Sequence, residues 1–186
     1  MDSTLWGQLR GGDKTALERI YRDHCAVLLK YGRKFSSDSQ MVEDCLQDLF
    51  VELWKNREGL SNTDSIRKYL LVALRRKIIR ALSSLRISSQ EPEEHHFSAV
   101  FDIEGQWIIE EDDEERRKQL QKALNSLSKR QQEVLYLKFF MDMDYAQISE
   151  IMELNYQSAR NLAHRALEAL RDIMAILIFL FCLAGF

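Results

Sequence analysis

Apolar residues recur at helical spacing along most of the chain, most clearly between residues 144 and 171. This stretch reads DYAQISEIMELNYQSARNLAHRALEALR and predicts two short helices joined by a tight turn, each with one buried face. A helix-turn-helix often has Gly in its turn, and this chain has Glu153 there. The apolar positions are Ile148, Ile151, Met152, Leu154, Ala159, Leu162, Ala163, Ala166 and Leu170.

The opposite face of the second predicted helix carries polar groups of the kind that read base edges in a major groove. These residues are Gln157, Ser158, Arg160, Asn161, His164 and Arg165. A lone amphipathic helix pair builds only core about as often as it binds a ligand. The face therefore indicates duplex DNA as a partner only together with the rest of the chain.

The first half of the chain predicts three further helices. Asp13 can cap the first, which runs to about Phe35, and the second begins near Ser37 or Asp38 and ends before Gly59. The third spans about Thr63 to Leu82. Their expected inward residues are Leu17, Ile20, Tyr21, Cys25, Leu28, Leu29, Tyr31, Met41, Val42, Cys45, Leu46, Leu49, Phe50, Leu53, Trp54, Ile66, Tyr69, Leu70, Ala73, Leu74 and Ile78.

Composition favours an all-α fold. The 186 residues include one Pro and seven Gly, and 46% are apolar, which is enough for one or two small domains. Three cysteines without metal-ligand spacing fit a reducing cytosol better than disulfides, and we expect no metal or other cofactor. Residues 1–10 lack the basic start and apolar run of a signal peptide, so we expect a cytoplasmic protein.

Charge is strongly segregated although the net charge is only −3. Residues 65–90 contain bases without acids: Arg67, Lys68, Arg75, Arg76, Lys77, Arg80 and Arg86. Residues 91–115 contain eleven acids without a base. A basic block suits phosphates, and a dense acidic block is typical of a solvated linker. The pattern predicts two helical modules joined by an acidic linker.

The second predicted helix has an acidic stripe made of Glu43, Asp44, Gln47, Asp48 and Glu52. Taken alone, the stripe is best explained as a solvated face, and a docking surface for a partner is the alternative.

The ordered combination of these segments resembles a known family. VEDCLQDLFVELWKNRE is followed by SIRKYLLVALRRKIIRAL, the acidic linker, and ALNSLSKRQQEVLYLKFF before the helix-turn-helix. This order resembles bacterial RNA polymerase sigma factors of the extracytoplasmic-function (ECF) type, which keep only regions 2 and 4. The resemblance implies region 2 at residues 1–86, the linker at 87–116, region 4 at 117–172 and an apolar tail at 173–186.

The resemblance also implies roles for residues of the first module. Asp44, Gln47 and Asp48 would contact core RNA polymerase, whereas Leu49, Phe50 and Trp54 would be core. Six bases would hold and open the −10 element: Arg67, Lys68, Arg75, Arg76, Lys77 and Arg80. Many relatives carry Asn at the position of Arg76, so the usual −10 preference is in doubt. Relatives place a base-capturing segment where Asn56–Asp64 lies, and Tyr69 would be a buried aromatic.

In the second module, the resemblance places the second helix of the pair in the major groove of the −35 element. Gln157, Ser158, Arg160 and Asn161 would face base edges, with His164 and Arg165 nearer the backbone, and Leu162 would pack. Ser128 would cap the helix that begins SKRQQEV. The helices that precede the helix-turn-helix would share a core made of Leu124, Leu127, Val134, Leu135, Leu137, Phe139 and Phe140.

Two segments keep open interpretations. The acidic linker either mimics nucleic acid inside polymerase or is simply solvated, although its apolar residues, including Phe97, predict some packing. His95 and His96 do not predict a metal site, because no further ligand is suitably spaced. The tail IMAILIFLFCLAGF is too short to span a bilayer, so a packed extension is expected first and an interfacial membrane contact second.

The expected function is that of a sigma factor, with core RNA polymerase, promoter DNA and an anti-sigma factor as partners and no small-molecule substrate. Membrane contact would be indirect or through the tail. No enzyme motif is present: the sequence has no nucleophile elbow, phosphate-binding glycine loop or metal-ligand cluster. The alternative is a stand-alone helix-turn-helix regulator that binds operators without polymerase.

Overall fold

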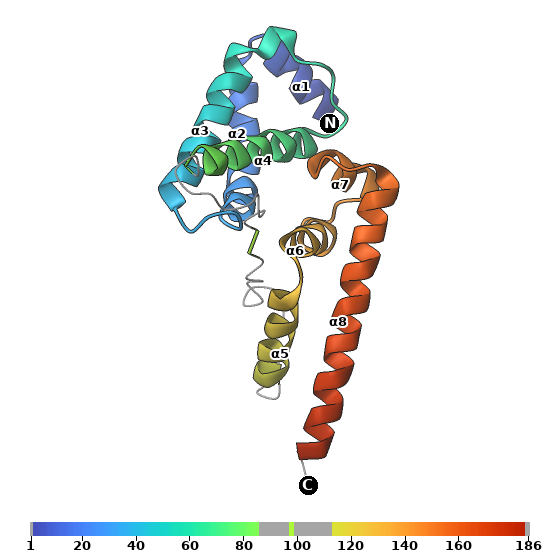
Figure 1. The fold of residues 1–186 in the computed structure, drawn as a ribbon. Coiled ribbons are helices and arrows are strands. Elements are labelled where there is room, and N and C mark those ends of the chain that lie inside the picture. Colours follow the sequence, from blue (N-terminus) through green and yellow to red (C-terminus); the bar gives the residue numbers. More distant parts are fainter. Residues whose placement is uncertain (1, 86–96, 99–112, 185–186) are drawn as a thin grey trace. The chain divides into compact units, whose positions relative to one another are not determined.

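The computed structural model describes residues 2–85, 97–98 and 113–184, and gives the side-chain surroundings for 2–84, 97–98 and 120–172. All regular secondary structure in these ranges is helical, as the sequence predicts. The chain divides into two compact units, Met1–His95 and His96–Phe186, each with its own core (Figure 1).

The first unit contains α1 (Asp2–Arg10), α2 (Lys14–Gly32), α3 (Ser39–Lys55), a short 3-10 turn η1 (Arg57–Gly59) and α4 (Ile66–Leu85). The predicted cap of α2 is present, since Asp13 accepts from the Thr15 N–H at 2.8 Å, and α3 begins where expected, with Asp38 accepting from the Met41 N–H at 3.1 Å. Hydrogen bonding to Thr15 also lowers the pKa of the Asp13 carboxyl.

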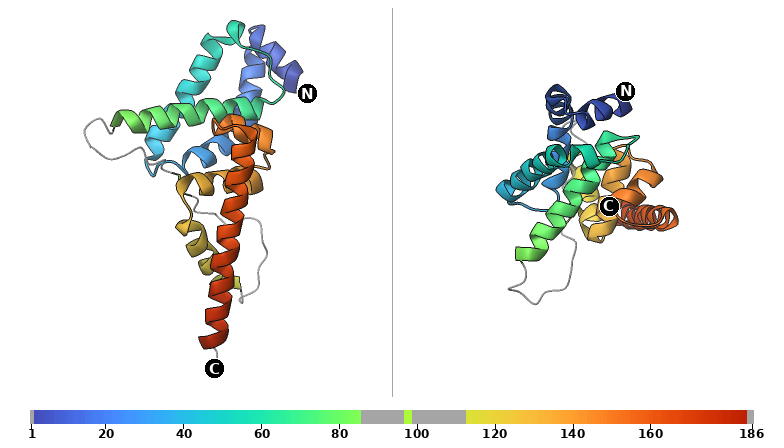
Figure 2. Two further views of the ribbon diagram at one scale, coloured as in Figure 1. Left: turned by 45° about the vertical axis from the view of Figure 1, so that its right-hand side comes forward. Right: turned by 90° about the horizontal axis from the view of Figure 1, so that it is seen from above.

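Helices α2, α3 and α4 pack against one another (Figures 1 and 2) and enclose an apolar core. At Gly32, the backbone of α2 lies close against side chains of α3 and α4. A Cβ atom added there would lie 2.6 Å from Val42 Cγ1 and 3.1 Å from Ile78 Cδ1. The fully buried members of this core include Ile20, Leu28, Tyr31, Val42, Ile66, Leu70, Leu71, Leu74 and Ile78.

Helix α1 was not predicted from the sequence. It lies beside the segment that joins α3 to α4 (Figures 1 and 2) and buries Trp6 and Leu9. The Trp6 indole N–H donates to the Ser61 carbonyl at 2.8 Å, and its ring meets the Tyr69 ring edge-on at 4.9 Å. Tyr69 is half-buried rather than fully buried, and burial raises the pKa of its hydroxyl.

The second unit contains α5 (Asp113–Ser126), α6 (Lys129–Leu135), a π-helical turn η3 (Tyr136–Phe140), α7 (Tyr145–Ile151) and α8 (Tyr156–Ala184). Helices α5, α6 and α7 each contact α8. As predicted, Ser128 caps α6, in a reciprocal box with Gln131. Phe97 from the linker is buried, with its ring 5.7 Å from that of Tyr136, so the prediction that part of the linker packs is confirmed.

The second unit differs from the sequence-based expectations in two places. Phe139 and Phe140 are not core, because they are 59% and 42% exposed. Helix α8 is not short: it has 29 residues and continues into the apolar tail. The packing of the tail side chains, like most of the acidic linker and His95 and His96, lies outside the described residues. Among the residues described, no helix has the length and apolar character needed to cross a membrane.

Candidate functional site

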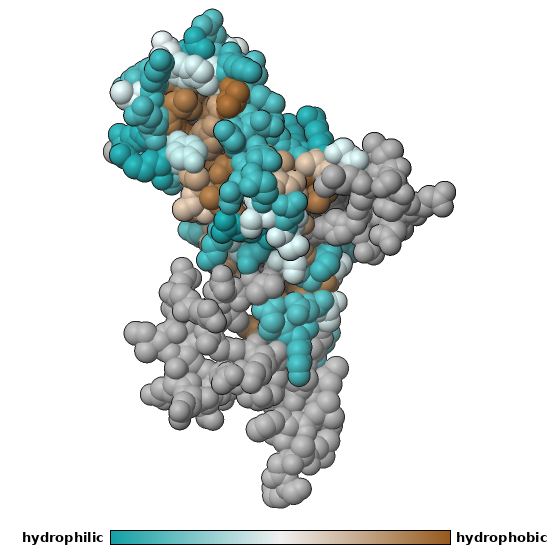
Figure 3. All heavy atoms as spheres, turned by 90° about the vertical axis from the view of Figure 1, so that its left-hand side faces the viewer, coloured by the Kyte–Doolittle hydropathy of each residue, from teal (hydrophilic) through white to brown (hydrophobic). Residues whose placement is uncertain are grey.

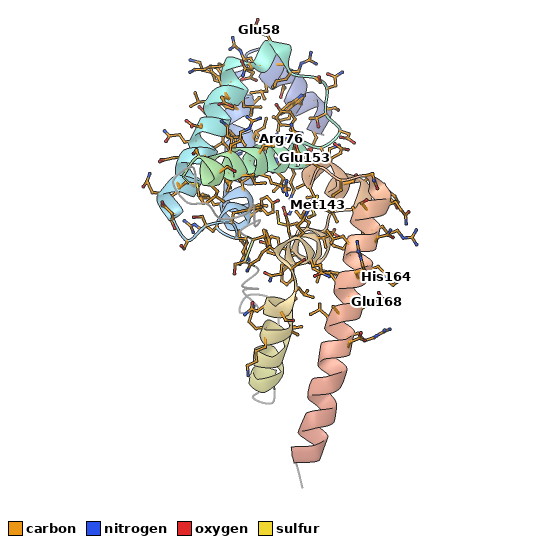
Figure 4. The ribbon with its side chains drawn as sticks, viewed as in Figure 1. Glu58, Arg76, Met143, Glu153, His164 and Glu168 are labelled. Atoms are coloured by element: carbon orange, nitrogen blue, oxygen red, sulfur yellow. The ribbon has the colours of Figure 1, made fainter. Side chains whose placement is uncertain are left out.

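The turn between α7 and α8 has the geometry of a helix-turn-helix. Asp144 accepts from the Gln147 N–H at 2.8 Å, while the Gln147 side chain accepts from the Asp144 N–H at 3.0 Å, which fixes the start of α7. Glu153 then takes a left-handed conformation with φ of 54° (Figure 4). Asn155 accepts from the Ser158 N–H at 2.7 Å, so it caps the first turn of α8.

Over residues 156–172, one face of α8 is buried and the other is open to solvent. Ala159, Ala163 and Ala166 are fully buried at spacings of four and three residues. The residues predicted to read DNA occupy the remaining surface: Gln157, Arg160, Asn161, His164 and Arg165 are exposed, and Ser158 is partly buried. The structure therefore brings all six predicted residues to the first three turns of one helix.

Hydrogen bonds within this face fix the orientation of several side chains. The Gln157 amide N–H donates to Asn161 Oδ1 at 3.0 Å, and Arg165 Nε donates to the Asn161 carbonyl at 3.4 Å. His164 Nδ1 lies 3.3 Å from Glu168 Oε2 on the next turn (Figure 4). Gln157 and Asn161 thus form a linked amide pair that offers both donors and acceptors beside the Arg160 guanidinium.

The basic helix α4 places its six predicted DNA contacts in different environments. Arg76 and Arg80 are exposed one turn apart, so both are accessible to a phosphate (Arg76 in Figure 4). Arg67 is partly buried. Lys68 is only 12% exposed and lies 3.0 Å from Asp64 Oδ1, and this hydrogen bond lowers the pKa of the Asp64 carboxyl.

The prediction that Arg75 contacts DNA is wrong for this structure. Its side chain is 3% exposed, so it points into the first unit and not toward a solvent-borne phosphate. Lys77 also differs from the expectation, since it is 19% exposed and its Nζ lies 2.6 Å from Glu52 Oε1 on α3. Fewer of the six predicted bases on α4 are therefore accessible to DNA than the sequence indicates.

An open groove of about 810 Å³ lies between α2 and α3. From α2 come Leu17, Tyr21, Cys25 and Leu29, one per helical turn, and from α3 come Glu43, Leu46, Gln47, Phe50, Val51, Trp54 and Lys55. Tyr21 and Val51 are 48% and 43% exposed, so part of the apolar lining of this groove is open to solvent. Figure 3 shows hydrophobic atoms gathered among hydrophilic ones on the first unit.

The predicted docking residues lie on α3, which forms one wall of this groove. Gln47 lines it, and Asp44 and Asp48 are exposed on the same helix, α3. The α2 side was missed by sequence reasoning, which assigned Leu17, Tyr21 and Cys25 to the core. Their four-residue spacing is the same for a buried stripe and for an open groove, so the sequence alone could not distinguish the two.

Family comparison finds two matches in the chain. Residues 20–87 match the family described as Sigma-70 region 2, and residues 117–170 match Sigma-70, region 4. Between them the two matches account for more than half of the chain, in the order that the sequence predicts.

Curated relatives extend the similarity over nearly the whole length. The ECF RNA polymerase sigma factor SigK of Mycobacterium ulcerans (strain Agy99) is 21% identical over 176 residues, covering 92% of each chain. The ECF RNA polymerase sigma factor SigL of Mycobacterium tuberculosis (strain H37Rv) is 23% identical over 164 residues, covering 83% of this chain and 86% of its own.

Solved structures share the fold. CnrH, determined in complex with the cytosolic domain of CnrY, aligns with a TM-score of 0.61 at 17% identity, covering 94% of this chain and 97% of CnrH. The sigma factor RpoE from Bartonella quintana, determined with the anti-sigma factor NepR, aligns with a TM-score of 0.60 at 18% identity, covering 88% and 96%.

Proposed function

Since the chain belongs to the sigma-70 family as an ECF RNA polymerase sigma factor, we propose that it binds core RNA polymerase through the α2–α3 groove, holds the −10 element with α4 and reads the −35 element with α8. The observation that carries this proposal is the presence of two distinct open surfaces: a largely apolar groove on the first unit, and a polar, partly cationic helix face suited to contacting DNA on the second.

The groove has the character of a protein-binding site. Tyr21, Phe50 and Trp54 provide aromatic area, and such residues dominate the energy of protein interfaces. The exposed carboxylates of Asp44 and Asp48 on α3 would orient a basic partner and raise its association rate. In this proposal the apolar groove supplies affinity for polymerase and the acidic stripe supplies orientation.

Promoter opening is assigned to the first unit. Arg76 and Arg80 are the exposed cations of α4, so they would hold backbone phosphates of the −10 element. Arg67 and Lys68 would contribute from less exposed positions. The polymerase performs nucleotide addition, and this chain determines where it starts.

The −35 element is assigned to α8. Gln157 and Asn161 can pair with an adenine edge, and Arg160 can reach guanine O6 and N7. Each unit alone makes few contacts, so free protein would bind DNA weakly. Polymerase would fix the spacing of the two units and convert two weak contacts into one strong complex.

We further propose control by an anti-sigma factor. RpoE was solved in complex with the anti-sigma factor NepR, and CnrH in complex with the cytosolic domain of CnrY. The open apolar groove of the first unit suits such an inhibitor, because covering it would remove the surface assigned to polymerase.

The test is co-purification of the full chain with core RNA polymerase, followed by transcription from a library of random promoters. A stable complex that initiates at a shared −35/−10 pair is the expected result. Direct binding to duplex operators without polymerase affinity would instead make the chain a stand-alone regulator and overturn the assignment of the groove.

A further inference from the structure

Phe97, which lies within the acidic linker, is part of the core of the second unit. Its side chain is fully buried, and its ring lies 5.7 Å from the ring of Tyr136, which is 1% exposed. Tyr136 also stacks on Phe140, with ring centroids 5.6 Å apart and an interplanar angle of 7°. The second unit accordingly begins at His96, next to this contact, although most of the linker follows it in the sequence.

Tyr136 connects this contact to the helix that is assigned to the −35 element. It is the first residue of η3, and its carbonyl accepts from the Met141 N–H at 3.1 Å. Helix α6, which directly precedes η3, packs against α8. Burial of an aromatic ring removes a large apolar area from water, and an aromatic pair adds further stabilisation. Phe97 is therefore held against the same core as α8.

The burial of Phe97 shortens the connection between the two units. Helix α4 ends at Leu85, twelve residues before Phe97 and twenty-eight before the start of α5 at Asp113. A fully extended chain spans at most about 3.6 Å per residue, so Phe97 can lie no more than about 43 Å from the end of α4. If the second unit were attached only from α5 onward, the corresponding limit would be about 100 Å.

We propose that Phe97 is a positioning residue, which anchors the linker to the second unit and so sets the longest spacing between −35 and −10 elements that the chain can bridge. This inference rests on the proposed function, in which α4 holds one element and α8 reads the other. Each base pair added between the elements moves them apart by about 3.4 Å. Polymerase would bring the two units together, while the anchored linker would limit how far apart they can act.

Phe97→Ala removes the anchoring ring. Holoenzyme that contains this variant should gain activity on promoters whose spacer is longer than the preferred one by two or three base pairs. We expect a gain of about fivefold, relative to activity at the preferred spacing, because a longer tether reaches the displaced element. The readout is in vitro transcription from promoters that differ only in spacer length. A merely structural role for Phe97 would instead lower transcription by the same factor at every spacing.

Two matched variants should keep the wild-type spacer profile. Phe97→Leu retains a large apolar side chain, so the linker should remain anchored. Phe139→Ala removes an aromatic ring from η3, but this ring is 59% exposed and its loss should not release the linker. A profile in Phe139→Ala that matches Phe97→Ala would overturn the assignment of the anchor to Phe97.

Insertions on either side of Phe97 test the anchor without altering a buried side chain. Six Gly and Ser residues add up to about 20 Å of reach. Between residues 93 and 94, before the anchor, the insertion should extend the range of spacers used by the otherwise wild-type chain. Between residues 105 and 106, after the anchor, it should have no effect unless Phe97→Ala is also present.

The anchor is also measurable without polymerase. Electron paramagnetic resonance between spin labels at Glu58 of η1 and Asp172 of α8, both exposed, reports the longest distance between the units in the free chain. The labels are attached through unnatural amino acids, because the chain has three cysteines of its own. The longest distance should increase in Phe97→Ala and with the insertion before Phe97, but not with the insertion after it.

The outcomes separate this inference from the proposed function. Failure of the wild-type chain to direct core polymerase would overturn the proposed function and the role in promoter spacing, whereas the distance measurement would still test the anchor. Equal effects of the two insertions in the wild-type chain would overturn the anchor. Longer distances in free Phe97→Ala with an unchanged spacer profile would overturn the role in promoter spacing alone.

Discussion

The Lys77 ammonium on α4 lies 2.6 Å from the Glu52 carboxylate on α3. Only 19% of the Lys77 side chain is exposed, so its charge is engaged within the first unit. Arg80, on the same helix, is exposed. Two cations three residues apart therefore have different expected roles, one in joining helices and one in contacting DNA.

Arg80→Ala should reduce the salt dependence of holoenzyme binding to promoter DNA. The slope of log Kobs against the logarithm of the salt concentration is negative, and loss of one phosphate contact should make it less steep by about 0.7–0.9. Lys77→Met should leave that slope unchanged and lower the free energy of unfolding by about 0.5–1 kcal/mol. Filter binding over a salt series and urea unfolding measure the two quantities. A less steep slope in Lys77→Met with an unchanged slope in Arg80→Ala would mean that Lys77, and not Arg80, contacts the DNA.

Arg160→Ala should lower transcription from −35-dependent promoters roughly five- to 150-fold. This corresponds to about 1–3 kcal/mol of binding free energy, because a guanidinium proposed to read a base edge is lost. Core polymerase binding should not change. The matched control is Arg171→Ala, which removes an exposed arginine three turns further along α8. In vitro transcription with and without the −35 element is the measurement, and equal losses in both variants would contradict a base-reading role.

Asp48→Arg should weaken core polymerase binding, since it reverses a charge on the helix that forms one wall of the groove. Asp23→Arg makes the same charge change on α2 at an exposed residue that does not line the groove. Affinity measured by surface plasmon resonance should fall at least tenfold for the first variant and remain near wild type for the second. Comparable affinity in both would remove α3 from the docking surface.

Gly32→Ala should destabilise the first unit by about 1–3 kcal/mol, the usual cost of overpacking a core. The added methyl would lie 2.6 Å from Val42 Cγ1, and neither helix can retreat without disturbing the other contacts of the core. Gly7→Ala in α1 is the control, because no atom lies within 4 Å of the added methyl. It should raise stability by up to about 1 kcal/mol through helix propensity. Thermal unfolding followed by circular dichroism measures both.

Glu153→Gly should stabilise the second unit by about 0.5–1 kcal/mol. Glu153 has a φ of 54°, a region where a side chain is strained and glycine is not. Glu150→Gly places the same substitution within α7, where it should cost about 1 kcal/mol. Urea unfolding should show a higher free energy of unfolding for Glu153→Gly and a lower one for Glu150→Gly. Destabilisation by both substitutions would mean that Glu153 makes a contact worth more than its backbone strain.

The helices of the two cores were predictable because their signals are local. Asp13 and Ser128 cap the helices expected of them, and Asp38 stands at the expected start of α3 and caps it. The α7–α8 turn was also predictable, although Glu153 stands where glycine is usual, because the apolar spacing on both sides remained intact. Family comparison then agrees with the fold and function that the ordered segments indicated.

Helix α1 was missed because its stability comes from distant partners. Its nine residues include Gly7, and its apolar residues are few, so local propensity is weak. Trp6 is buried by the segment around Ser61 and by Tyr69, which no short window of sequence reveals. Arg75 was misassigned for a related reason: a row of bases on one helix does not say which of them turns inward.

Phe139 and Phe140 were misplaced by an irregularity of the backbone. They lie in a π-helical turn, where each hydrogen bond spans one residue more than in an α-helix. The extra residue rotates the end of this turn away from the face expected at 3.6-residue spacing, and the two rings emerge into solvent. The sequence contains no signal for such a turn.

The unbroken length of α8 makes it a lever. Its 29 residues correspond to about 43 Å, and the side chains that we propose to read bases occupy one end. A stiff rod of this length converts a tilt of about 10° into a displacement of about 7 Å at its far tip. In the proposed function, a partner that binds the far end of α8 would therefore change the angle at which the other end meets the DNA groove, without contacting a base.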